Sequence, residues 1–282
     1  MKKGINIWSF PEGMSISECS RIAKDAGFDG IELALTETGE LGLQTSDEKI
    51  REIRALMDDI GIEICGFATG LYWSYSMTSG DAKMRQKAID ICKRQLELAA
   101  AFEVDTILVI PGGVNADLQS NDKVVNYEKA YEFALEAMQE LSNDAKASGV
   151  NIGIENVWNK FLLSPLEMRS FIDTVGSEYV GSYFDVGNVV YSGYPEHWIQ
   201  ILGERIKKVH LKDYRREVGG LAGFVDLLAG DVNYPAVIDA LREIGYNNYV
   251  TAEMIPAYTH HSTQIIYNTS RSMDAILRGS VK

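Results

Sequence analysis

The sequence is poor in histidine, cysteine, proline and positive charge. Its 282 residues include four histidines, three cysteines and six prolines, and 40 acidic residues outnumber 27 basic ones to give a formal net charge of −13. A net charge of this sign opposes attraction to nucleic acid and to an anionic membrane surface. We therefore expect neither of them as a partner. Any phosphorylated ligand would need a local cluster of basic side chains.

The cysteines and the hydrophobic runs are equally sparse. Cys19, Cys65 and Cys92 are odd in number and form no CxxC pair, which is typical of reduced thiols in a cytoplasmic protein. No segment approaches the roughly 18 to 20 consecutive apolar residues of a transmembrane helix. The N-terminus begins with lysines, but the apolar stretch that follows is too short for a signal peptide. We expect a cytoplasmic location.

Short runs rich in isoleucine and valine alternate with longer segments of helical periodicity, which is typical of parallel β-α units. The pattern predicts strands over 4–8, 30–33, 62–66, 106–110, 151–155, 180–185, 206–210 and 249–253. It predicts helices over 17–26, 47–60, 81–102, 126–147, 166–175, 195–202, 234–244 and 264–277. We find no serine-, glycine- or proline-rich linker and no internal repeat. The predicted fold is α/β, a (β/α)8 TIM barrel that forms one domain over residues 1–282.

Four polar residues each end an apolar run: Glu155, Asp185, His210 and Glu253. They fall on the last four predicted strands, whose C-terminal ends meet at the barrel mouth where active sites of this fold lie. Three carboxylates and one imidazole suit Mn²⁺, Co²⁺ or Mg²⁺, and we favour Mn²⁺. One such residue is readily explained by capping or by an arginine partner, but three carboxylates packed together at four consecutive strand ends need a cation to offset their repulsion. Glu32 ends a strand alone, and we interpret it as structural.

The segments around these residues resemble a known family. They are Gly153-Ile-Glu-Asn156, Phe184-Asp-Val-Gly-Asn188, Val209-His-Leu-Lys-Asp213, Gly230-Asp-Val-Asn-Tyr-Pro235 and Ala252-Glu253. Together they are similar to the sugar phosphate isomerase/epimerase family with the xylose-isomerase-like barrel. Within it the ketose and ketose-phosphate 3-epimerases are the most similar. The resemblance covers the whole chain in order.

The resemblance implies a divalent-metal-dependent enzyme that acts on a small-molecule ketose or ketose phosphate. Glu155 and Glu253 would face each other across the substrate, one removing the C3 proton and the other returning it through an enediolate. Asp185 and His210 would be mainly metal ligands. An aldose-ketose isomerase, which moves a proton between C1 and C2, is the alternative on the same ligands. A dehydratase of the inositol-catabolic type is another.

Four neighbouring residues are candidates for contacts with the substrate: Trp8, Lys160, Asn188 and Arg216. Arg216 resembles an arginine that holds substrate oxygens near C2 in these epimerases, although Arg215 could serve instead. Four aromatic residues lie at or after the ends of the first and third strands: Trp8, Phe67, Tyr72 and Trp73. These residues would wall the mouth, pack in the core or, on the loop at 71–75, support a homo-oligomer.

Two departures from the family pattern bear on the substrate. Asn188 and Leu162 stand where the free-sugar epimerases carry a histidine and a glutamate. This favours a ketopentose 5-phosphate such as L-ribulose or L-xylulose 5-phosphate. The basic residues that could bind its phosphate, or that could simply be solvated, are Lys160, Lys212, Arg215 and Arg216.

Two further classes of protein are alternatives. Related barrels include abasic-site endonucleases, which hold several metal ions and use many histidines, whereas this chain has four in total. A non-catalytic sugar-binding protein is the other, and it predicts that no metal stays bound.

Overall fold

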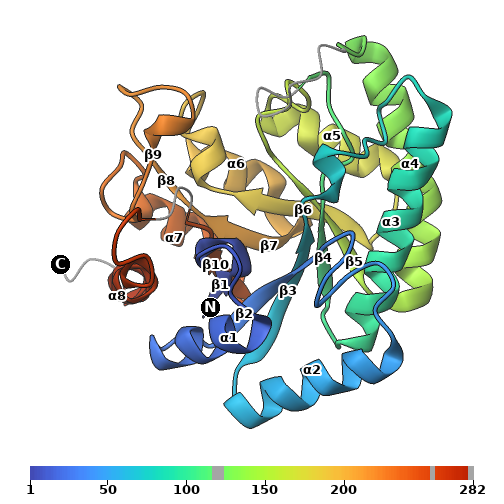
Figure 1. The fold of residues 1–282 in the computed structure, drawn as a ribbon. Helices are drawn as coiled ribbons and strands as arrows, with labels where there is room; N and C mark the ends of the chain where they lie inside the picture. Colours follow the sequence, from blue (N-terminus) through green and yellow to red (C-terminus); the bar gives the residue numbers. More distant parts are fainter. Residues whose placement is uncertain (116–123, 255–257, 279–282) are drawn as a thin grey trace.

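The chain forms a closed barrel. In the computed structural model, which describes residues 1–115, 124–254 and 258–278, eight parallel strands close the barrel in the order β1-β10-β7-β6-β5-β4-β3-β2. Eight α-helices lie around the outside of the barrel within the same residues (Figure 1). The predicted (β/α)8 fold is therefore confirmed.

The predicted strands and helices are all present, with ends displaced by up to three residues. The barrel strands are β1 (Lys2–Asn6), β2 (Gly30–Leu35), β3 (Glu63–Thr69), β4 (Thr106–Val109), β5 (Asn151–Glu155), β6 (Val180–Asp185), β7 (Ile206–Leu211) and β10 (Tyr249–Ala252). The helices are α1 (Ile16–Asp25), α2 (Asp47–Ile60), α3 (Ala82–Ala101), α4 (Tyr127–Ser148), α5 (Pro165–Val175), α6 (Pro195–Leu202), α7 (Tyr234–Glu243) and α8 (Gln264–Arg278).

Side-chain caps explain where several helices begin and end. Ser15 and Glu18 form a capping box at the start of α1, and Ser164 caps α5 with proline at the first helical position. Gly61 ends α2 with φ of 73°, a left-handed conformation that a residue with a Cβ adopts at a cost. Gly61 and the pair Ser164 and Pro165 agree with the predicted boundaries, whereas the helix predicted from residue 17 begins one residue earlier because Ser15 is its cap.

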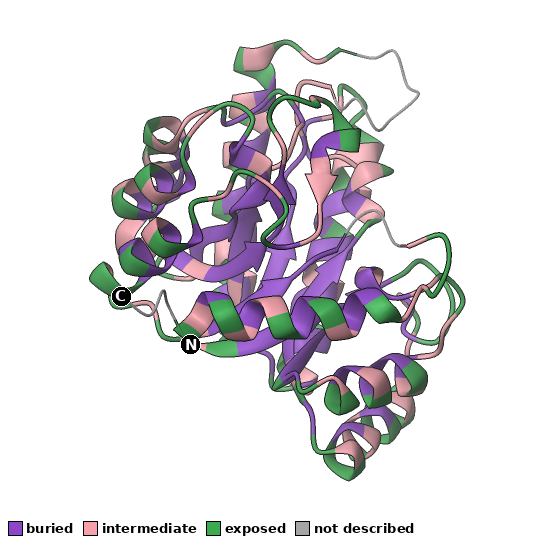
Figure 2. Cartoon of the chain, turned by 90° about the vertical axis from the view of Figure 1, so that its left-hand side faces the viewer, coloured by how far each residue is buried: buried purple, intermediate pink, exposed green. Residues whose placement is uncertain are grey.

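The barrel strands form the buried centre, while the helices keep exposed residues on their outer faces (Figure 2). β2 and β6 are buried at every residue, as expected for parallel strands covered on both sides. Among the described residues, the helices are too short or too polar to cross a membrane.

A side chain from α3 reinforces the junction between β3 and β4. In the described residues these strands pair in register at Phe67 and Ile107 alone. The amide of the fully buried Gln95 donates to the carbonyl of Phe67 at 2.8 Å and to that of Leu108 at 3.2 Å. Gln95 also accepts a hydrogen bond from the Tyr72 hydroxyl at 2.8 Å. One helix residue thus satisfies backbone groups of both strands.

A short hairpin that the sequence did not predict lies between β7 and α7. It consists of β8 (Asp213–Tyr214) and β9 (Phe224–Val225), which are antiparallel and too short to show a period-2 pattern. The carboxylate of Asp213 accepts hydrogen bonds from the backbone N–H groups of Leu228, Gly230 and Val232 at 2.9 to 3.2 Å. These bonds fix the segment that follows the hairpin.

Candidate metal centre

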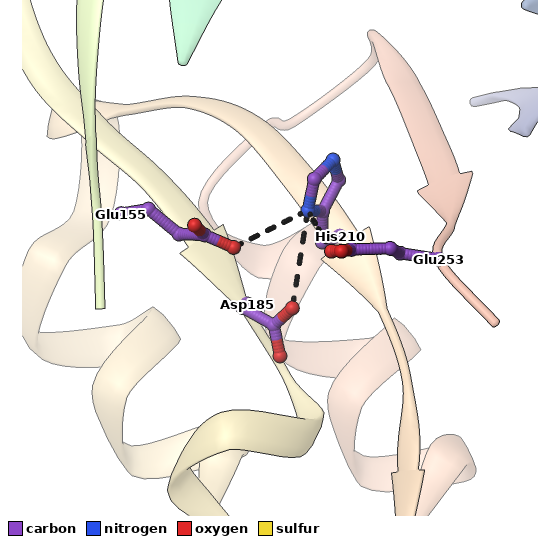
Figure 3. A group of neighbouring side chains, drawn as sticks. All are labelled: Glu155, Asp185, His210 and Glu253. Carbon is purple, nitrogen blue, oxygen red and sulfur yellow. Dashed lines mark ion pairs between the residues drawn. The ribbon is translucent and has the colours of Figure 1, made fainter. Parts of the chain in front are cut away.

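The four strand-end residues meet at one point in the barrel mouth (Figure 3). Glu155 ends β5, Asp185 ends β6, His210 lies near the end of β7, and Glu253 directly follows β10. One potential ligand atom from each residue lies within 4.8 Å of those of the other three. The Nδ1 atom of His210 is 3.0 Å from Glu253 Oε2, 3.4 Å from Glu155 Oε1 and 3.9 Å from Asp185 Oδ2.

Strand register and one amide side chain explain this convergence. Asp185 and His210 are direct partners in the β6–β7 ladder, so their side chains are neighbours. The side chain of Asn156, the residue after Glu155, donates to the carbonyl of Asp185 at 2.8 Å and accepts from its N–H at 2.9 Å. Asn156 therefore holds the ends of β5 and β6 in fixed relation.

Two buried polar atoms in the cluster have no hydrogen bond: Asp185 Oδ2 and His210 Nδ1. Both point toward the other carboxylates (Figure 3). Both atoms lie beside charged groups, since Lys212 Nζ is 3.1 Å from Asp185 Oδ2 and Glu253 Oε2 is 3.0 Å from His210 Nδ1, but neither makes a hydrogen bond. A divalent cation could bind both atoms directly, and three carboxylates and one imidazole fit such an ion.

Burial and charge shift the ionisation of the two glutamates in opposite directions. Burial raises the pKa of Glu155 to about 7, and the contact with His210 and the charge of Lys212 offset it only in part. Burial also acts to raise the pKa of Glu253, but the attraction of Lys212 and His210 outweighs it and lowers that pKa to about 2. The pair can thus hold one ionised and one protonatable carboxyl group near neutral pH.

Glu32 at β2 orients the histidine ligand. The Oε1 atom of Glu32 is 2.8 Å from His210 Nε2 and accepts a hydrogen bond from the Asn6 amide. The Oε2 atom of Glu32 accepts a hydrogen bond from the Tyr183 hydroxyl. A Cβ at Gly66 would lie 2.3 Å from Glu32 Oε2, so the absence of a side chain there makes room for the network. We interpret Glu32 as structural, and its role is to hold the His210 ring so that Nδ1 faces the other ligands.

The ammonium group of Lys212 lies among the carboxylates. Its Nζ atom is 2.9 Å from Glu253 Oε2 and 3.1 Å from Asp185 Oδ2. Burial acts to lower the pKa of Lys212, but the charges of Asp185, Glu253 and Glu155 outweigh it and raise that pKa. Sequence reasoning treated Lys212 as a candidate for binding phosphate, whereas the structure pairs it with two of the candidate metal ligands.

A cavity of about 580 Å³ opens onto Glu155 and Glu253. It contains two residues expected to contact substrate, Trp8 and Asn188. Its lining consists of Trp8, Thr69, Gly70, Trp73, Leu108, Ile110, Glu155, Val157, Trp158, Asn188, Lys212, Leu221, Ala222, Phe224 and Glu253.

Most of the apolar lining was not anticipated from the sequence, including Trp158, Leu221 and Phe224. Trp158 comes three residues after Glu155, so its place just beyond a strand end could have identified it. Leu221 and Phe224 belong to the unpredicted hairpin, and the sequence carries no comparable signal for them.

Two other expected substrate contacts are not among the residues that line this cavity. The guanidinium of Arg216 donates to the carbonyls of Val190 and Gly193 and lies 5.1 Å from the ring centre of Tyr194. Lys160 lines a neighbouring cavity of about 490 Å³, which shares Trp158 and Asn188 with the first cavity.

The remaining aromatic candidates divide between the cavity and the core. Trp73 lines the cavity. Phe67 is fully buried and packs against Phe102 with ring centres 6.0 Å apart, and the buried Tyr72 contacts Gln95. Core packing, the other interpretation considered for them, therefore applies to Phe67 and Tyr72.

Known proteins resemble this chain along nearly its whole length. A putative L-ribulose-5-phosphate 3-epimerase of Haemophilus influenzae is 22% identical over 90% of this chain and 88% of its own length. The crystal structure of a D-psicose 3-epimerase in the presence of D-fructose superimposes with a TM-score of 0.80 at 19% identity, covering 97% of each chain. The structure of an L-ribulose 3-epimerase gives 0.78 at 17% identity, covering 98% of this chain and 94% of that one.

The family assignment rests on a match over most of the sequence. Residues 20–274, which include all four candidate ligands, match the family described as xylose isomerase-like TIM barrel. That description agrees with the closed barrel and with the resemblance seen in the sequence motifs. The chain belongs to the xylose isomerase-like TIM barrel family.

Proposed function

We propose that this protein is a divalent-metal-dependent 3-epimerase of a ketose or ketose phosphate. The observation that carries the proposal is the pair of buried glutamates, Glu155 and Glu253, which approach the same histidine atom and differ widely in pKa. Inversion at a carbon next to a carbonyl needs one group to remove a proton and another to supply one. The names of the similar proteins, which include ketose 3-epimerases, support the same reaction.

Glu155, Asp185, His210 and Glu253 would hold the cation, and their hard donor set favours Mn²⁺, with Co²⁺ or Mg²⁺ as alternatives. A divalent cation at this position supplies Lewis acidity, which makes the C–H bond next to a ketone easier to ionise. Glu32 fixes the imidazole, and Asn156 fixes the backbone of Asp185, so the ligands are positioned before anything binds.

The two glutamates would then divide the proton transfer. Glu253 has the lower pKa, is ionised at neutral pH and can accept the C3 proton of one epimer. Burial makes Glu155 the more basic of the two carboxylates, with a pKa of about 7 in the metal-free site, so it is better suited to take up a proton and deliver it to the opposite face. In the reverse direction the two roles exchange. The apolar walls of the cavity limit access of water to the carbanion-like species.

The site of proton exchange separates the epimerase from its alternatives. We would incubate the Mn²⁺-loaded protein with a panel of ketoses and ketose phosphates in D₂O and locate the deuterium by NMR. The proposal expects deuterium at C3 of recovered substrate and product. Exchange at C1 alone would identify an aldose-ketose isomerase, and loss of water would identify a dehydratase. Absence of exchange and of turnover throughout the panel would reject an enzyme of this type.

The metal requirement separates the remaining classes. The described residues contain one group with the geometry of a metal site, formed by three acidic side chains and one histidine, whereas an abasic-site endonuclease would need several ions. A non-catalytic sugar-binding protein would retain no metal after dialysis. We further propose a cytoplasmic location, which the three buried, unpaired cysteines support.

A further inference from the structure

The cavity next to the two glutamates is mostly apolar. Its walls include Trp8, Trp73, Trp158, Phe224, Leu108 and Ile110. The indole N–H of Trp158 donates to the carbonyl of Asn188 at 2.8 Å, so the polar atom of this ring is already used within the protein. The ring also lies 5.3 Å from that of Phe224. The aromatic wall is thus held in place by its own contacts.

Apart from the indole rings, the neutral polar side chains of the lining, Thr69 and Asn188, donate hydrogen bonds to the protein. The hydroxyl of Thr69 donates to the carbonyl of Leu35 at 2.7 Å. The amide of Asn188 donates to the carbonyl of Asn156 at 2.9 Å. The wall therefore offers flat aromatic faces more readily than a ring of free hydrogen-bond donors.

Positive charge is nearly absent from this lining. Among the described residues that line the cavity, Lys212 is the single basic one, and it is paired with Asp185 and Glu253. Segments 116–123 and 255–257, outside the described residues, contain one basic residue and two aspartates in their sequence. With a net charge of −13 on the chain, a phosphate dianion in this cavity would meet repulsion, since Lys212 is already paired and Lys160 lies in the neighbouring cavity.

The cavity is also larger than a five-carbon sugar requires. Its volume of about 580 Å³ lies within the range of roughly 300–1,000 Å³ that is usual for sites holding drug-sized ligands. A five-carbon sugar bound at the carboxylates is smaller than such ligands. Room remains for a second ring, whose C–H faces would contact the indoles and Phe224.

We infer that the substrate is a ketose joined, at the end away from its carbonyl, to a neutral second ring such as another sugar. This inference rests on the proposed function for its chemistry and replaces the phosphate expected from the sequence with an uncharged, ring-shaped group. The carbonyl end meets the candidate metal ligands, and the second ring lies against the aromatic wall.

A matched series of fructose derivatives tests the inference. Binding of D-fructose, isomaltulose (a glucosyl ring on O6 of fructose) and D-fructose 6-phosphate to the Mn²⁺-loaded protein would be measured by calorimetry. We expect isomaltulose to bind about tenfold more tightly than fructose, the gain from one ring stacked on an aromatic wall. Fructose 6-phosphate should bind no more tightly than fructose, and inorganic phosphate should not compete. Stronger binding of the phosphate ester than of isomaltulose, or no preference for isomaltulose over fructose, would overturn the inference.

Variants of the wall locate the effect. Trp73→Ala and Phe224→Ala should each reduce the preference for isomaltulose at least about threefold. Tyr194→Ala, which removes an exposed aromatic side chain outside the cavity lining, should leave the preference unchanged. Mn²⁺ affinity and circular dichroism report whether each variant is folded. An unchanged preference in both folded wall variants would contradict the assignment of the second ring to this wall.

The experiments distinguish failure of the second-ring inference from failure of the proposed epimerase function. Deuterium exchange at C3 of a ketose without a preference for isomaltulose would reject the second ring and leave the epimerase. A preference without any exchange would leave a binding site for the two-ring ligand and reject the epimerase.

Discussion

The Nε2 atom of His210 lies 2.8 Å from Oε1 of Glu32, and both side chains are fully buried. This contact joins β2 to β7 across the barrel and determines which imidazole nitrogen faces the three other candidate ligands. Burial acts to lower the pKa of His210, but Glu32, Glu155 and Glu253 outweigh it and hold that pKa well above its usual range. In the metal-free site the ring is therefore held protonated, and because Glu32 keeps the proton on Nε2, loss of the other proton would leave Nδ1 free for a cation.

Substitution of Glu32 should weaken metal binding without removing a ligand. In Glu32→Gln the charge that orients His210 is lost, and we expect Mn²⁺ affinity to fall about 10- to 100-fold, the usual effect of losing such a partner. The affinity would be measured by calorimetry. Glu63→Gln is the matched control, because Glu63 lies at the start of β3 and pairs with Lys2 on an exposed surface. Equal Mn²⁺ affinities in the two variants would argue against a positioning role for Glu32.

Removal of the metal should lower thermal stability. Without a cation, three carboxylates lie buried close together around Lys212 and His210, and Asp185 Oδ2 and His210 Nδ1 make ion-pair contacts but no hydrogen bond. A cation present at about 100 times its Kd adds about 2.7 kcal/mol to the free energy of unfolding. For a chain of this size that corresponds to a rise in Tm of roughly 5 to 10 °C. Calorimetry before and after treatment with EDTA measures it, and an unchanged Tm on adding back Mn²⁺ would count against the site.

Metal binding should release protons and strengthen as pH rises. Cation ligands must be deprotonated, yet the pKa of His210 is well above its usual value and that of Glu155 is about 7. Below pH 7 the cation must displace protons from both His210 and Glu155. Above pH 7 Glu155 is already ionised, and the cation displaces the proton of His210. We therefore expect about one to two protons to be released per Mn²⁺ at pH 7.

Titration in buffers of different ionisation enthalpy counts these protons. The observed binding enthalpy should vary linearly with the enthalpy of the buffer, and the slope gives the number released. The apparent affinity should increase between pH 6 and pH 8. A slope of zero, or an affinity that falls over this interval, would contradict the ionisation states described above.

Much of the fold could be predicted because each β-α unit carries its own local signals. Ser164 and Pro165 mark the start of α5, and Gly61 marks the end of α2. The strand ends at Glu155 and Asp185 follow from apolar runs that stop abruptly. Since barrel geometry turns four consecutive strand ends into one site, the predicted ligands did not require any knowledge of tertiary contacts.

The remaining features depend on contacts between distant segments. The role of Glu32 is set by Tyr183 and His210, which are more than 150 residues away in sequence. The position of Lys212 depends on its pairing with Asp185 and Glu253 rather than on any local pattern. Charge alone could not distinguish a lysine that neutralises metal ligands from one that binds phosphate.

The contacts of Gln95 should make it important for the stability of the barrel. Gln95→Leu would leave the carbonyls of Phe67 and Leu108 and the hydroxyl of Tyr72 without their buried partner. We expect a loss of about 2 to 4 kcal/mol in the free energy of unfolding, measured with urea. The control is Gln86→Leu, an exposed position on the same helix. Equal stabilities of the two variants would show that the junction of β3 and β4 does not depend on this amide.

Each of the two glutamates should exchange the C3 proton on one face of the sugar only, so variants of the two should differ in the epimer that they exchange. Glu155→Gln and Glu253→Gln should each slow interconversion of the C3 epimers by about 10²- to 10⁴-fold, because a neutral amide cannot accept the proton. Each variant keeps one carboxylate, so it should still exchange deuterium into the epimer whose C3 proton faces that group, without inversion. The two variants should therefore exchange opposite epimers, as measured by NMR at saturating Mn²⁺ with Glu63→Gln as the control. If both variants exchanged the same epimer, or if either interconverted epimers at the rate of the unmodified protein, the two glutamates could not be acting on opposite faces.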